Sequence, residues 1–431
     1  MSEHVTTPPA PPAPAHFTAP YAPLSDALAI AAFGVQNGVL SPVQRGVLLE
    51  TSSGSLALTT FDFDTAVTVT LPVDTATTGT SLLDHGQLKK ALAAMVAGET
   101  KATAARTAVT VTGDLLTTDH LTLPLPALDL AEFVHPPTAA PTIAVVEAQQ
   151  LLTQIQRVLP AAGTDDTLPA LMGVRMTLGS QTLTLSATDR YRFAVADVPL
   201  TDSTPLEDTL SALIPASTLN RLTKRLKAYE GPVALGISDG TADSPSAPSP
   251  TTGAPRVALT AASSPRVTLT MGTTTVTIRQ MEGDQIGHGA LFPKTADTSL
   301  TIDRATALRA LKKCHAMIKA MGSTSSPVTL MWDETGALSL APRVGTDDEQ
   351  ARTKGMALPS TTISGATPRN REVSLNPLFF KDGLDGFHGD TVTLHLRDED
   401  ADKPLKPVLL TAGPHVVGED YRHLLMPIRI R

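Results

Sequence analysis

Two carboxylates spaced two residues apart are the first candidates for chemistry in this chain. Asp62 and Asp64 stand in the stretch TFDFDT, and an i,i+2 spacing puts both side chains on one face of a strand. A carboxylate pair can hold the metal ion of a nuclease. No third ligand is suggested nearby, so a solvent-facing strand edge is the favoured interpretation, and a metal-dependent nuclease using this pair is kept as a minor alternative.

Other residue types that could react form no pattern. The 11 histidines are scattered, and a single cysteine, Cys314, excludes an internal disulfide and a thiolate zinc cluster. The chain has no G-x-x-x-x-G-K-[ST] loop, no H-E-x-x-H and no G-x-S-x-G. These residue types therefore give no recognised catalytic motif, and no cofactor is expected.

Composition indicates a globular chain of several domains. The chain has 431 residues, of which 42% are hydrophobic and 3% aromatic, so its cores must be built from aliphatic side chains. There is no run of 18 apolar residues, so no membrane span is expected. The first residues carry neither a basic start nor an apolar core, so they are not a secretory signal. We expect residues 1–20 to be a disordered Pro-rich tail and the protein to be cytoplasmic.

Three stretches of similar size repeat one rhythm of helix, strands, helix and strands. We place domains at residues 21–137, 138–290 and 291–431, with a disordered insertion at about 238–255. Period-2 alternation in the strands predicts antiparallel sheets with one buried face. The fold class is therefore α+β, with similar units packed side by side into an arc or ring. The expected helices cover residues 24–35 (with Ser25 as N-cap), 84–96, 145–159, 215–229, 303–321 and 376–387.

Positive charge is clustered although the net charge is −8. Residues 17–137 hold 5 basic and 11 acidic side chains, whereas the helices predicted at 215–229 and 303–321 carry basic residues with almost no acidic ones. Like charges on one helix face repel, so this segregation favours contact with phosphates. The residues expected to face DNA are Lys89, Lys90, Arg221, Lys224, Arg225, Lys227, Arg309, Lys312, Lys313 and Lys319. On the other face of the 303–321 helix we expect a buried stripe of Leu311, Cys314, Ile318 and Met321.

The chain ends on EDYRHLLMPIRIR, which is unusually apolar for a terminus. This ending, the stretch PALMGVRMTL followed by LSATDRYRFAV, and the stretch SLNPLFFKDGLDGF resemble bacterial DNA polymerase III beta sliding clamps. The resemblance covers roughly residues 20–431 and is weakest in the first stretch. It implies a head-to-tail homodimer whose six domains form a ring, with helices lining a channel around duplex DNA.

In that family a pocket between the second and third domains receives short peptides of DNA polymerases. The resemblance therefore implies that the polymerase III catalytic subunit and a clamp loader are partners, and that a separate ATP-driven loader opens the ring. By the same resemblance the pocket residues are Leu171, Thr188, Asp189, Arg190, Tyr191, Arg192, Phe193, Asn376, Phe379, Leu424, Leu425, Met426, Pro427 and Ile428. Arg192 and main-chain pairing are expected to orient the peptide.

Two departures from the family pattern bear on function. Arg190 and Tyr191 are bulkier than the Gly-His pair of some members, and Phe193 replaces a commoner Leu, which predicts a narrower pocket. These departures and the atypical first domain motivate an alternative, a specialised clamp paralogue such as an accessory copy that tolerates an inhibitor. We also hypothesise that Asp114 and Asp119 meet Arg352 and Lys354 across the dimer contact.

Overall fold

Strands dominate the part of the chain that the computed structural model describes, and there they form four antiparallel sheets. The structure describes residues 12–35, 42–206, 208–225, 227, 229–240, 264–283, 291–332, 337–359, 362–365, 372–397, 406–416 and 420–429. Most of the predicted insertion at 238–255 and all of residues 1–11 lie outside this set. The chain divides into two compact units.

Unit 1 comprises residues up to Ala148, Thr201–Thr204 and Lys224–Gln280. Its larger sheet has nine strands in the order β13-β9-β15-β16-β17-β4-β3-β2-β5, and its smaller sheet has four in the order β1-β6-β7-β8. The strands are β1 (His16–Pro20), β2 (Gly46–Ser52), β3 (Ser55–Phe61), β4 (Thr65–Pro72), β5 (Gly79–Asp84), β6 (Ala108–Thr112), β7 (Leu115–Thr117), β8 (Thr122–Pro124), β9 (Ala144–Glu147), β13 (Asp202–Ser203), β15 (Pro232–Ser238), β16 (Arg266–Met271) and β17 (Thr274–Arg279). The helices are α1 (Tyr21–Ala31), α2 (His85–Met95) and α3 (Lys101–Arg106), with short 3-10 turns at Ala32–Gly34, Pro42–Arg45 and Leu130–Glu132.

Unit 2 comprises Gln149–Leu200, Pro205–Thr223 and the residues from Met281 onward. Its sheets have the orders β14-β10-β11-β12-β26-β25-β24-β18-β22 and β21-β20-β19-β23. The strands are β10 (Gly173–Leu178), β11 (Thr182–Thr188), β12 (Arg192–Pro199), β14 (Leu210–Pro215), β18 (Thr298–Asp303), β19 (Val328–Trp332), β20 (Leu338–Pro342), β21 (Met356–Ala357), β22 (Thr362–Gly365), β23 (Glu372–Leu375), β24 (Thr391–Leu396), β25 (Val408–Thr411) and β26 (Tyr421–Leu425). The helices are α6 (Arg304–Ala320), α7 (Asp347–Arg352), α8 (Pro377–Asp385) and, starting at or running across the limits of the unit, α4 (Ala148–Val158) and α5 (Ala216–Arg225), with 3-10 turns η4 (Leu159–Ala161) and η5 (Pro169–Met172).

One four-strand order recurs along the chain. The series β5-β2-β3-β4, β14-β10-β11-β12 and β23-β19-β20-β21 have the same succession of strands, and so do β1-β6-β7-β8, β9-β15-β16-β17 and β18-β24-β25-β26. Members of the two series join where β4 pairs with β17 and where β12 pairs with β26. These junctions explain why the compact units divide the predicted middle domain: each nine-stranded sheet combines strands from two neighbouring stretches. The division into three domains stays a prediction.

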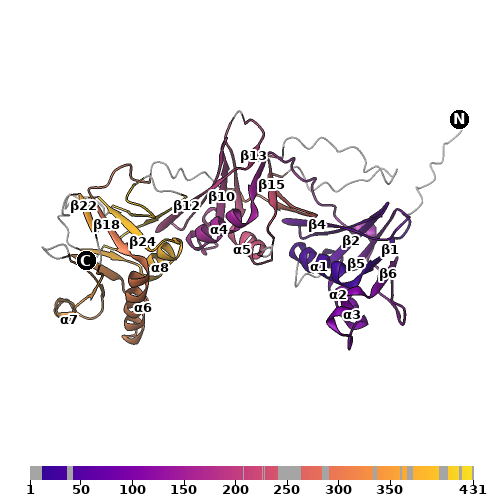
Figure 1. Cartoon of the computed structure of the whole chain (residues 1–431), viewed down its shortest axis with the longest axis horizontal. Coiled ribbons are helices and arrows are strands. Elements are labelled where there is room, and N and C mark those ends of the chain that lie inside the picture. Colours follow the sequence, from indigo (N-terminus) through magenta and orange to yellow (C-terminus); the bar gives the residue numbers. More distant parts are fainter. Residues whose placement is uncertain are drawn as a thin grey trace. The chain divides into compact units, whose positions relative to one another are not determined.

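Helices cover the sheets within each unit (Figure 1). In unit 1, α1 packs against β3 and β4 and contacts α2 and α3. In unit 2, α6 packs on β20 beside α8, and α8 packs on β26. The buried stripe of α6 includes Leu311, Cys314 and Ile318. The predicted α+β class with antiparallel sheets is thus confirmed, and no helix of the described residues is both long and apolar enough to cross a membrane.

Polar caps set the starts of α2, α6 and α8, and also those of α3 and α7. Asp84 accepts from the backbone N–H of Gln87 before α2, Asp303 from that of Thr306 before α6, and Asn376 from that of Leu378 before α8. Such caps satisfy amide groups that have no partner inside the helix. The hydrogen bonds to Thr306 also hold the pKa of the Asp303 carboxyl below its usual value.

Several local predictions were wrong. Residues 16–20 form β1 instead of a disordered tail, because Phe17 and Ala19 alternate with polar residues and are buried against β6. Ser25 is not an N-cap, since α1 already begins at Tyr21 after Pro20. The segment 144–147 is strand β9 and not the start of a helix, and α3 and α7 were not foreseen.

One residue assigned to the buried stripe is also misplaced. Met321 follows the last helical residue of α6 and is 67% exposed, because the chain turns away from the sheet there. Cys314 is buried as predicted, and burial raises the pKa of its thiol to about 11.

Candidate functional site

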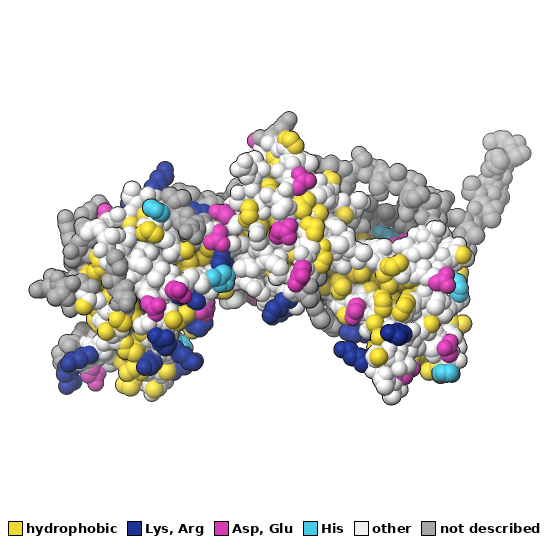
Figure 2. All heavy atoms as spheres, viewed as in Figure 1, with side chains coloured by type: hydrophobic (Ala, Val, Ile, Leu, Met, Phe, Trp, Pro, Cys, Tyr) yellow, Lys and Arg dark blue, Asp and Glu magenta, His cyan; other side chains and the backbone are white. Residues whose placement is uncertain are grey.

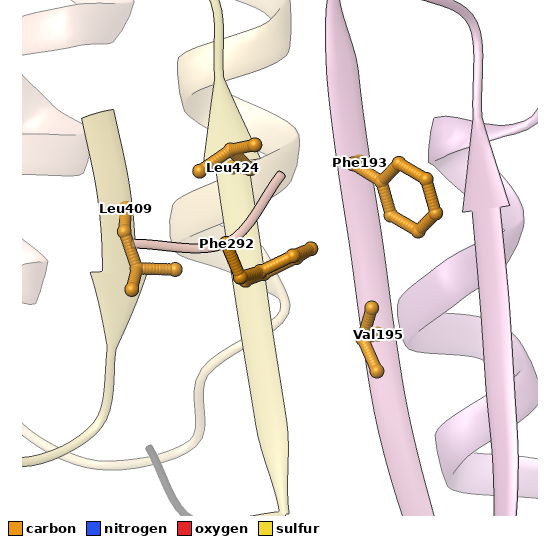
Figure 3. Close-up of a cluster of buried hydrophobic side chains, with 5 residues drawn as sticks. All are labelled: Phe193, Val195, Phe292, Leu409 and Leu424. Atoms are coloured by element: carbon orange, nitrogen blue, oxygen red, sulfur yellow. The ribbon is translucent and has the colours of Figure 1, made fainter. Parts of the chain in front are cut away.

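The candidate site of unit 2 is built on the junction between β12 and β26. These strands pair antiparallel from Arg192 opposite Leu425 to Ala196 opposite Tyr421. Beneath the junction, Phe193, Val195, Phe292, Leu409 and Leu424 form a buried apolar cluster (Figure 3). The ring of Phe193 meets that of Phe292 edge to face at 5.7 Å between centroids. The junction is therefore a packed core that holds the loops at its end in place.

The side chain of Asp189, the first residue after β11, holds the turn between β11 and β12. Oδ1 of Asp189 accepts from the backbone N–H groups of Tyr191 and Arg192, both at 3.0 Å. Thr188 contributes a hydroxyl that accepts from the N–H of Arg190 and donates to the carbonyl of Arg192. Arg190 has a φ of +78°, a conformation that costs a non-glycine residue about 1–2 kcal/mol. The turn therefore presents Arg190 and Tyr191 to solvent on a rigid frame.

Four side chains stack at this turn in a cation–aromatic column, defined as Arg190, Tyr191, Phe379 and Arg192. The Arg190 guanidinium lies 5.9 Å from the Tyr191 ring, the Tyr191 and Phe379 rings lie 6.5 Å apart at 26°, and the Arg192 guanidinium lies 4.2 Å from the Phe379 ring. Contacts of cations with aromatic faces within about 6 Å are attractive. Tyr191 is 57% exposed, so the outer part of the column is open to a ligand.

Arg192 anchors the inner end of the column. Its Nε donates to Oδ2 of Asp189 at 2.9 Å and its Nη1 to Oδ2 of Asp382 at 2.6 Å. Its side chain is only 10% exposed. Because its guanidinium bonds two carboxylates and covers a ring, Arg192 positions Phe379 and the turn. The expectation that Arg192 orients a peptide directly is not favoured by this geometry.

The start of α8 sets the position of Phe379. The Asn376 side chain accepts from the N–H groups of Leu378 and Phe379, at 2.9 and 3.3 Å. Pro377 occupies the first helical position, where a missing N–H costs nothing. Leu378 is 50% exposed beside the column.

The C-terminal segment runs past the column after β26 ends. The N–H of Met426 donates to the carbonyl of Tyr191 at 2.8 Å, and that of Ile428 donates to the carbonyl of Ser374 at 2.8 Å. Met426 is 38% exposed, and Pro427 and Ile428 are half-buried. Tyr191, Phe379, Leu378 and Met426 thus give the site an accessible apolar surface.

The predicted site residues fall into two groups. Thr188, Asp189, Arg190, Tyr191, Arg192, Asn376, Phe379, Met426, Pro427 and Ile428 are brought together at the end of the β12–β26 junction. Phe193, Leu424 and Leu425 are buried to 5% exposure or less. Phe193 and Leu424 belong to the apolar cluster of the junction, and the part of all three in binding stays a prediction. Leu171 is half-buried in η5, where its carbonyl accepts from the N–H of Gly163, and its role stays a prediction.

Sequence reasoning missed two residues that hold the site. Asp382 bonds Arg192, and Phe292 closes the apolar cluster against Phe193. Asp382 lies three positions after Phe379, which places both on one face of α8, so this spacing was a usable signal. Phe292 lies outside every strand and helix and gave no periodic signal.

Two polar side chains of β26 are buried together. His423 and Tyr421 share a hydrogen bond of 2.8 Å between Nδ1 and the hydroxyl. Burial, with the nearby Arg192 charge, lowers the pKa of His423 to about 3, and burial raises that of Tyr421. His423 is therefore neutral under ordinary conditions. Its Nε2 is buried and has no hydrogen-bond partner among the described residues.

Basic side chains stand out from the helices as predicted. Lys89 and Lys90 are exposed on α2, Arg221 and Lys224 on α5, and Lys227 just beyond it. On α6, the exposed basic residues are Arg309, Lys312, Lys313 and Lys319. Lys and Arg side chains gather over α6 within unit 2 (Figure 2). The Arg225 side chain lies outside the described residues, and that all these groups face DNA stays a prediction.

The nuclease alternative loses its geometric basis. Asp62 and Asp64 lie in the turn between β3 and β4, not on one face of a strand, because the strand ends at Phe61. Oδ1 of Asp62 accepts from two backbone N–H groups, those of Asp64 and Thr65. The described residues contain no group of three or more His, Cys, Asp or Glu suited to a metal.

Comparison with known proteins gives a consistent picture. A family model described as the DNA polymerase III beta subunit, central domain, matches residues 145–247. The chain is 28% identical over 411 residues to the beta sliding clamp of Streptomyces coelicolor, covering 94% of this chain and 97% of the relative. It is 24% identical over 391 residues to the beta sliding clamp homolog GriR of Streptomyces muensis, covering 90% and 92%.

Solved structures share the fold at lower identity. The DNA polymerase sliding clamp of Bacillus subtilis superposes with a TM-score of 0.76 at 17% identity, covering 96% of this chain and 99% of that one. A DnaN sliding clamp of Pseudomonas aeruginosa bound to griselimycin superposes with a TM-score of 0.73 at 18% identity, with the same coverage of 96% and 99%.

Proposed function

Since this chain belongs to the DNA polymerase III beta sliding clamp family, we propose that it is a DNA sliding clamp that encircles duplex DNA. A clamp is a processivity factor without catalysis of its own: it tethers the replicative polymerase and other partners. This function needs no cofactor, and its place is the cytoplasm, where replication occurs.

One observation about α6 carries the proposal. Arg309, Lys312, Lys313 and Lys319 are exposed on a helix that has no acidic residue between Arg304 and Ala320. Several cations on one helix bind phosphates by counterion release, independently of base sequence. Sequence-blind contact is what sliding requires. The basic residues of α2 and α5 would add to the same DNA-facing surface.

Partners would dock at the cation–aromatic column in unit 2. The accessible apolar surface of Tyr191, Phe379, Leu378 and Met426 suits the apolar side chains of a short peptide. The catalytic subunit of DNA polymerase III and the clamp loader are the expected owners of such peptides. That the other predicted pocket residues share in binding is part of the proposal.

Two free sheet edges support a head-to-tail homodimer. In the recurring four-strand order, β21 holds the place of β4 and β12, and β8 holds the place of β17 and β26. Within the chain, β4 pairs with β17 and β12 pairs with β26. By contrast, β8 and β21 each end a sheet in the described residues. Pairing β8 of one copy with β21 of another, twice, would close a ring of two chains. The exposed Leu121 and Leu123, at 51% and 37%, flank this edge.

A specialised paralogue is the second candidate. The chain is similar over nearly its whole length to the clamp homolog GriR, and Arg190 and Tyr191 crowd the partner site. If this clamp is an inhibitor-tolerant accessory copy, griselimycin should bind it weakly, and Arg190→Gly with Tyr191→His should tighten binding at least about 10-fold, about 1.4 kcal/mol. Tight binding by the unaltered protein, measured by calorimetry, would favour a main clamp instead.

Retention on DNA tests the main proposal. With the clamp loader of its source, the protein should stay on nicked circular duplex during gel filtration and leave the same duplex once it is linearised. Equal retention on both forms would reject encirclement. Cleavage of the DNA in the presence of Mg²⁺, lost on Asp62→Ala, would favour the nuclease.

A further inference from the structure

The turn between β3 and β4 in unit 1 has the same construction as the turn that carries the column in unit 2. Oδ1 of Asp62 accepts from the N–H groups of Asp64 and Thr65 at 3.1 and 2.6 Å, as Oδ1 of Asp189 does from the second and third residues after it. The N–H of Asp62 donates to the carbonyl of Thr65 at 3.2 Å, and the equivalent bond from Asp189 to Arg192 measures 3.4 Å.

The neighbouring strand also ends in the same way at both turns. In unit 1 the N–H of Arg279, at the end of β17, donates to the carbonyl of Asp64 at 2.7 Å. In unit 2 the N–H of Met426 donates to the carbonyl of Tyr191 at 2.8 Å. Phe63 therefore holds the place of Arg190, and Arg279 holds the place of Met426. The backbone that presents the proposed partner site is present a second time.

The Phe63 backbone has a strained conformation, and its side chain is partly exposed. Its φ is +73°, and Phe63 and Arg190 are the two non-glycine residues with positive φ in the described part of the chain. A left-handed conformation is a genuine outlier for a bulky side chain. The Phe63 ring is 41% exposed and contacts Phe61 at 5.5 Å between centroids. Strain and an exposed ring together point to a contact made by Phe63.

Two arginines lie beside this ring. Arg266 on β16 stands directly opposite Arg279 on β17, and like charges directly opposite each other destabilise a sheet. Arg266 is buried and donates from Nε to the carbonyl of Thr138 at 2.6 Å. The Arg279 side chain is 54% exposed, and its Nη1 lies 3.9 Å from the Asp64 carboxylate. An exposed pair at that distance is weak, so Arg279 can exchange it for a better-placed anion.

The two arginines and Phe63 line one slot. Phe61, Asp64, Pro137, Ser264 and Thr277 complete its walls, and its volume is about 10 Å³. A slot of this size admits no apolar side chain, so a ligand would lie across its mouth. There it would meet the Phe63 ring and the Arg279 guanidinium, which both line the slot.

We propose that this place, the Phe63 site, is a second peptide-docking site for a short acidic peptide with an apolar residue next to the acid. The carboxylate pairs with Arg279, where Arg266 adds positive potential, and the apolar side chain packs on Phe63 and Pro137. The assignment goes beyond the proposed function, which places partner peptides at the column of unit 2. A clamp with both sites could hold two partners, or one partner by two segments, on the same chain.

The test uses the full chain and a fluorescein-labelled peptide Gly-Ser-Glu-Phe-Leu-Ser-Gly, read by fluorescence anisotropy. The background variant Tyr191→Ala with Phe379→Ala removes the column, so that binding left in it reports the Phe63 site. Arg279→Ala in this background should weaken the remaining binding at least about 5-fold, about 1 kcal/mol. Arg106→Ala, which removes an exposed arginine on α3, is the matched control and should change nothing.

Phe63→Gly separates docking from folding. Glycine adopts positive φ without strain, so this variant should melt at the same or a higher temperature while losing the same binding. A peptide with Gln in place of Glu lacks the carboxylate. Its affinity for the background variant should be no higher than the affinity of the Glu peptide for the same variant carrying Arg279→Ala. The proposal is overturned if the background variant shows no binding at about 1 mM protein, or if Arg279→Ala and Phe63→Gly leave its binding unchanged. Neither result bears on the column, whose own binding is read in the unaltered chain.

Discussion

Arg192 and Asp382 are 190 positions apart in the chain and lie 2.6 Å apart in the fold, Nη1 to Oδ2. The bond links the start of β12 to α8. Through it, and through the guanidinium against the Phe379 ring, the column keeps its order. Asp382 bonds the guanidinium of Arg192, whose side chain is only 10% exposed, so we expect it to act by positioning Arg192.

Asp382→Asn should weaken partner binding while keeping the shape of the side chain. Without the carboxylate charge, Arg192 keeps its bond to Asp189, but its ion pair with α8 becomes a weaker bond to a neutral amide oxygen. We expect affinity for a peptide of the polymerase III catalytic subunit to fall about 5-fold, about 1 kcal/mol, in an anisotropy titration. Asp385→Asn, which alters the exposed partner of Lys381 on the same helix, should have no effect. Equal losses in both variants would show that Arg192–Asp382 has no special part.

The exposed cations of α6 should determine how DNA binding responds to salt. Lys312→Ala with Lys313→Ala should lower the slope of log affinity against log salt by about 2, because each phosphate contact contributes about 0.9. The measurement is binding to a short duplex over a series of NaCl concentrations. Lys294→Ala removes an exposed lysine outside the helices and should leave the slope unchanged. An unchanged slope in the double variant would place these lysines away from DNA.

The periodicity of apolar residues predicted the presence of the helices more accurately than the residues at which they end. The α6 stripe of Leu311, Cys314 and Ile318 was predictable because apolar residues recur at helical spacing. Met321 was misjudged since the same spacing continues past the end of the helix. β1 was missed because its five residues, between prolines, hold just two buried side chains, Phe17 and Ala19.

The candidate site was predictable as a set of motifs, but not as a geometry. The TDRYR stretch gave the turn, and its resemblance to the clamp family linked it with α8 and the C-terminus. Phe193 and Leu424 were assigned to the pocket by resemblance. They are buried in the apolar cluster with Phe292, and their part in peptide binding stays a prediction. The contact of Phe292 with this cluster was not predictable, because Phe292 lies outside every strand and helix. The spacing of Asp382 from Phe379 places both on one face of α8, but the bond from Arg192 to Asp382 is a tertiary contact, which no local pattern predicts.

The dimer contact should respond to charge at the edge of β21. Arg352 and Lys354 are exposed just before this strand, and Asp114 and Asp119 are exposed beside β7 and β8. Reversing the charges, Arg352→Glu with Lys354→Glu, should raise the monomer fraction in sedimentation velocity if these groups meet across the contact, since like charges then face each other. Adding Asp114→Lys and Asp119→Lys should restore the dimer.

The control for this prediction lies on another surface of unit 1. Lys101→Glu reverses an exposed charge at the start of α3 and should leave the dimer intact. If the dimer survives the double reversal, other groups form the contact. If Lys101→Glu weakens the dimer equally, the cause is the change in net charge and not a local contact.

Acid should destabilise unit 2 through His423. The folded state holds the pKa of this histidine at about 3, against an ordinary value of about 6.5, so the unfolded chain binds the proton more readily. Stability from the neutral His423 is therefore complete above pH 6.5 and is lost as the pH falls toward 3. At pH 5 the loss amounts to about 2 kcal/mol. His395, whose pKa burial lowers to about 4, adds a loss in the same direction.

The measurement is urea unfolding between pH 7.5 and 4.5, followed by the fluorescence of Trp332 on β19. His423→Gln loses packing and therefore lowers stability at every pH. As the pH falls, the unfolding free energy of this variant should decrease less steeply than that of the unaltered chain, by about 1.4 kcal/mol per pH unit. His120→Gln, which changes an exposed histidine, should keep the original slope. If the His423 variant has the same slope as the unaltered chain, other groups govern acid unfolding. In that case the neutral His423 of β26 adds nothing to the stability of the junction at neutral pH.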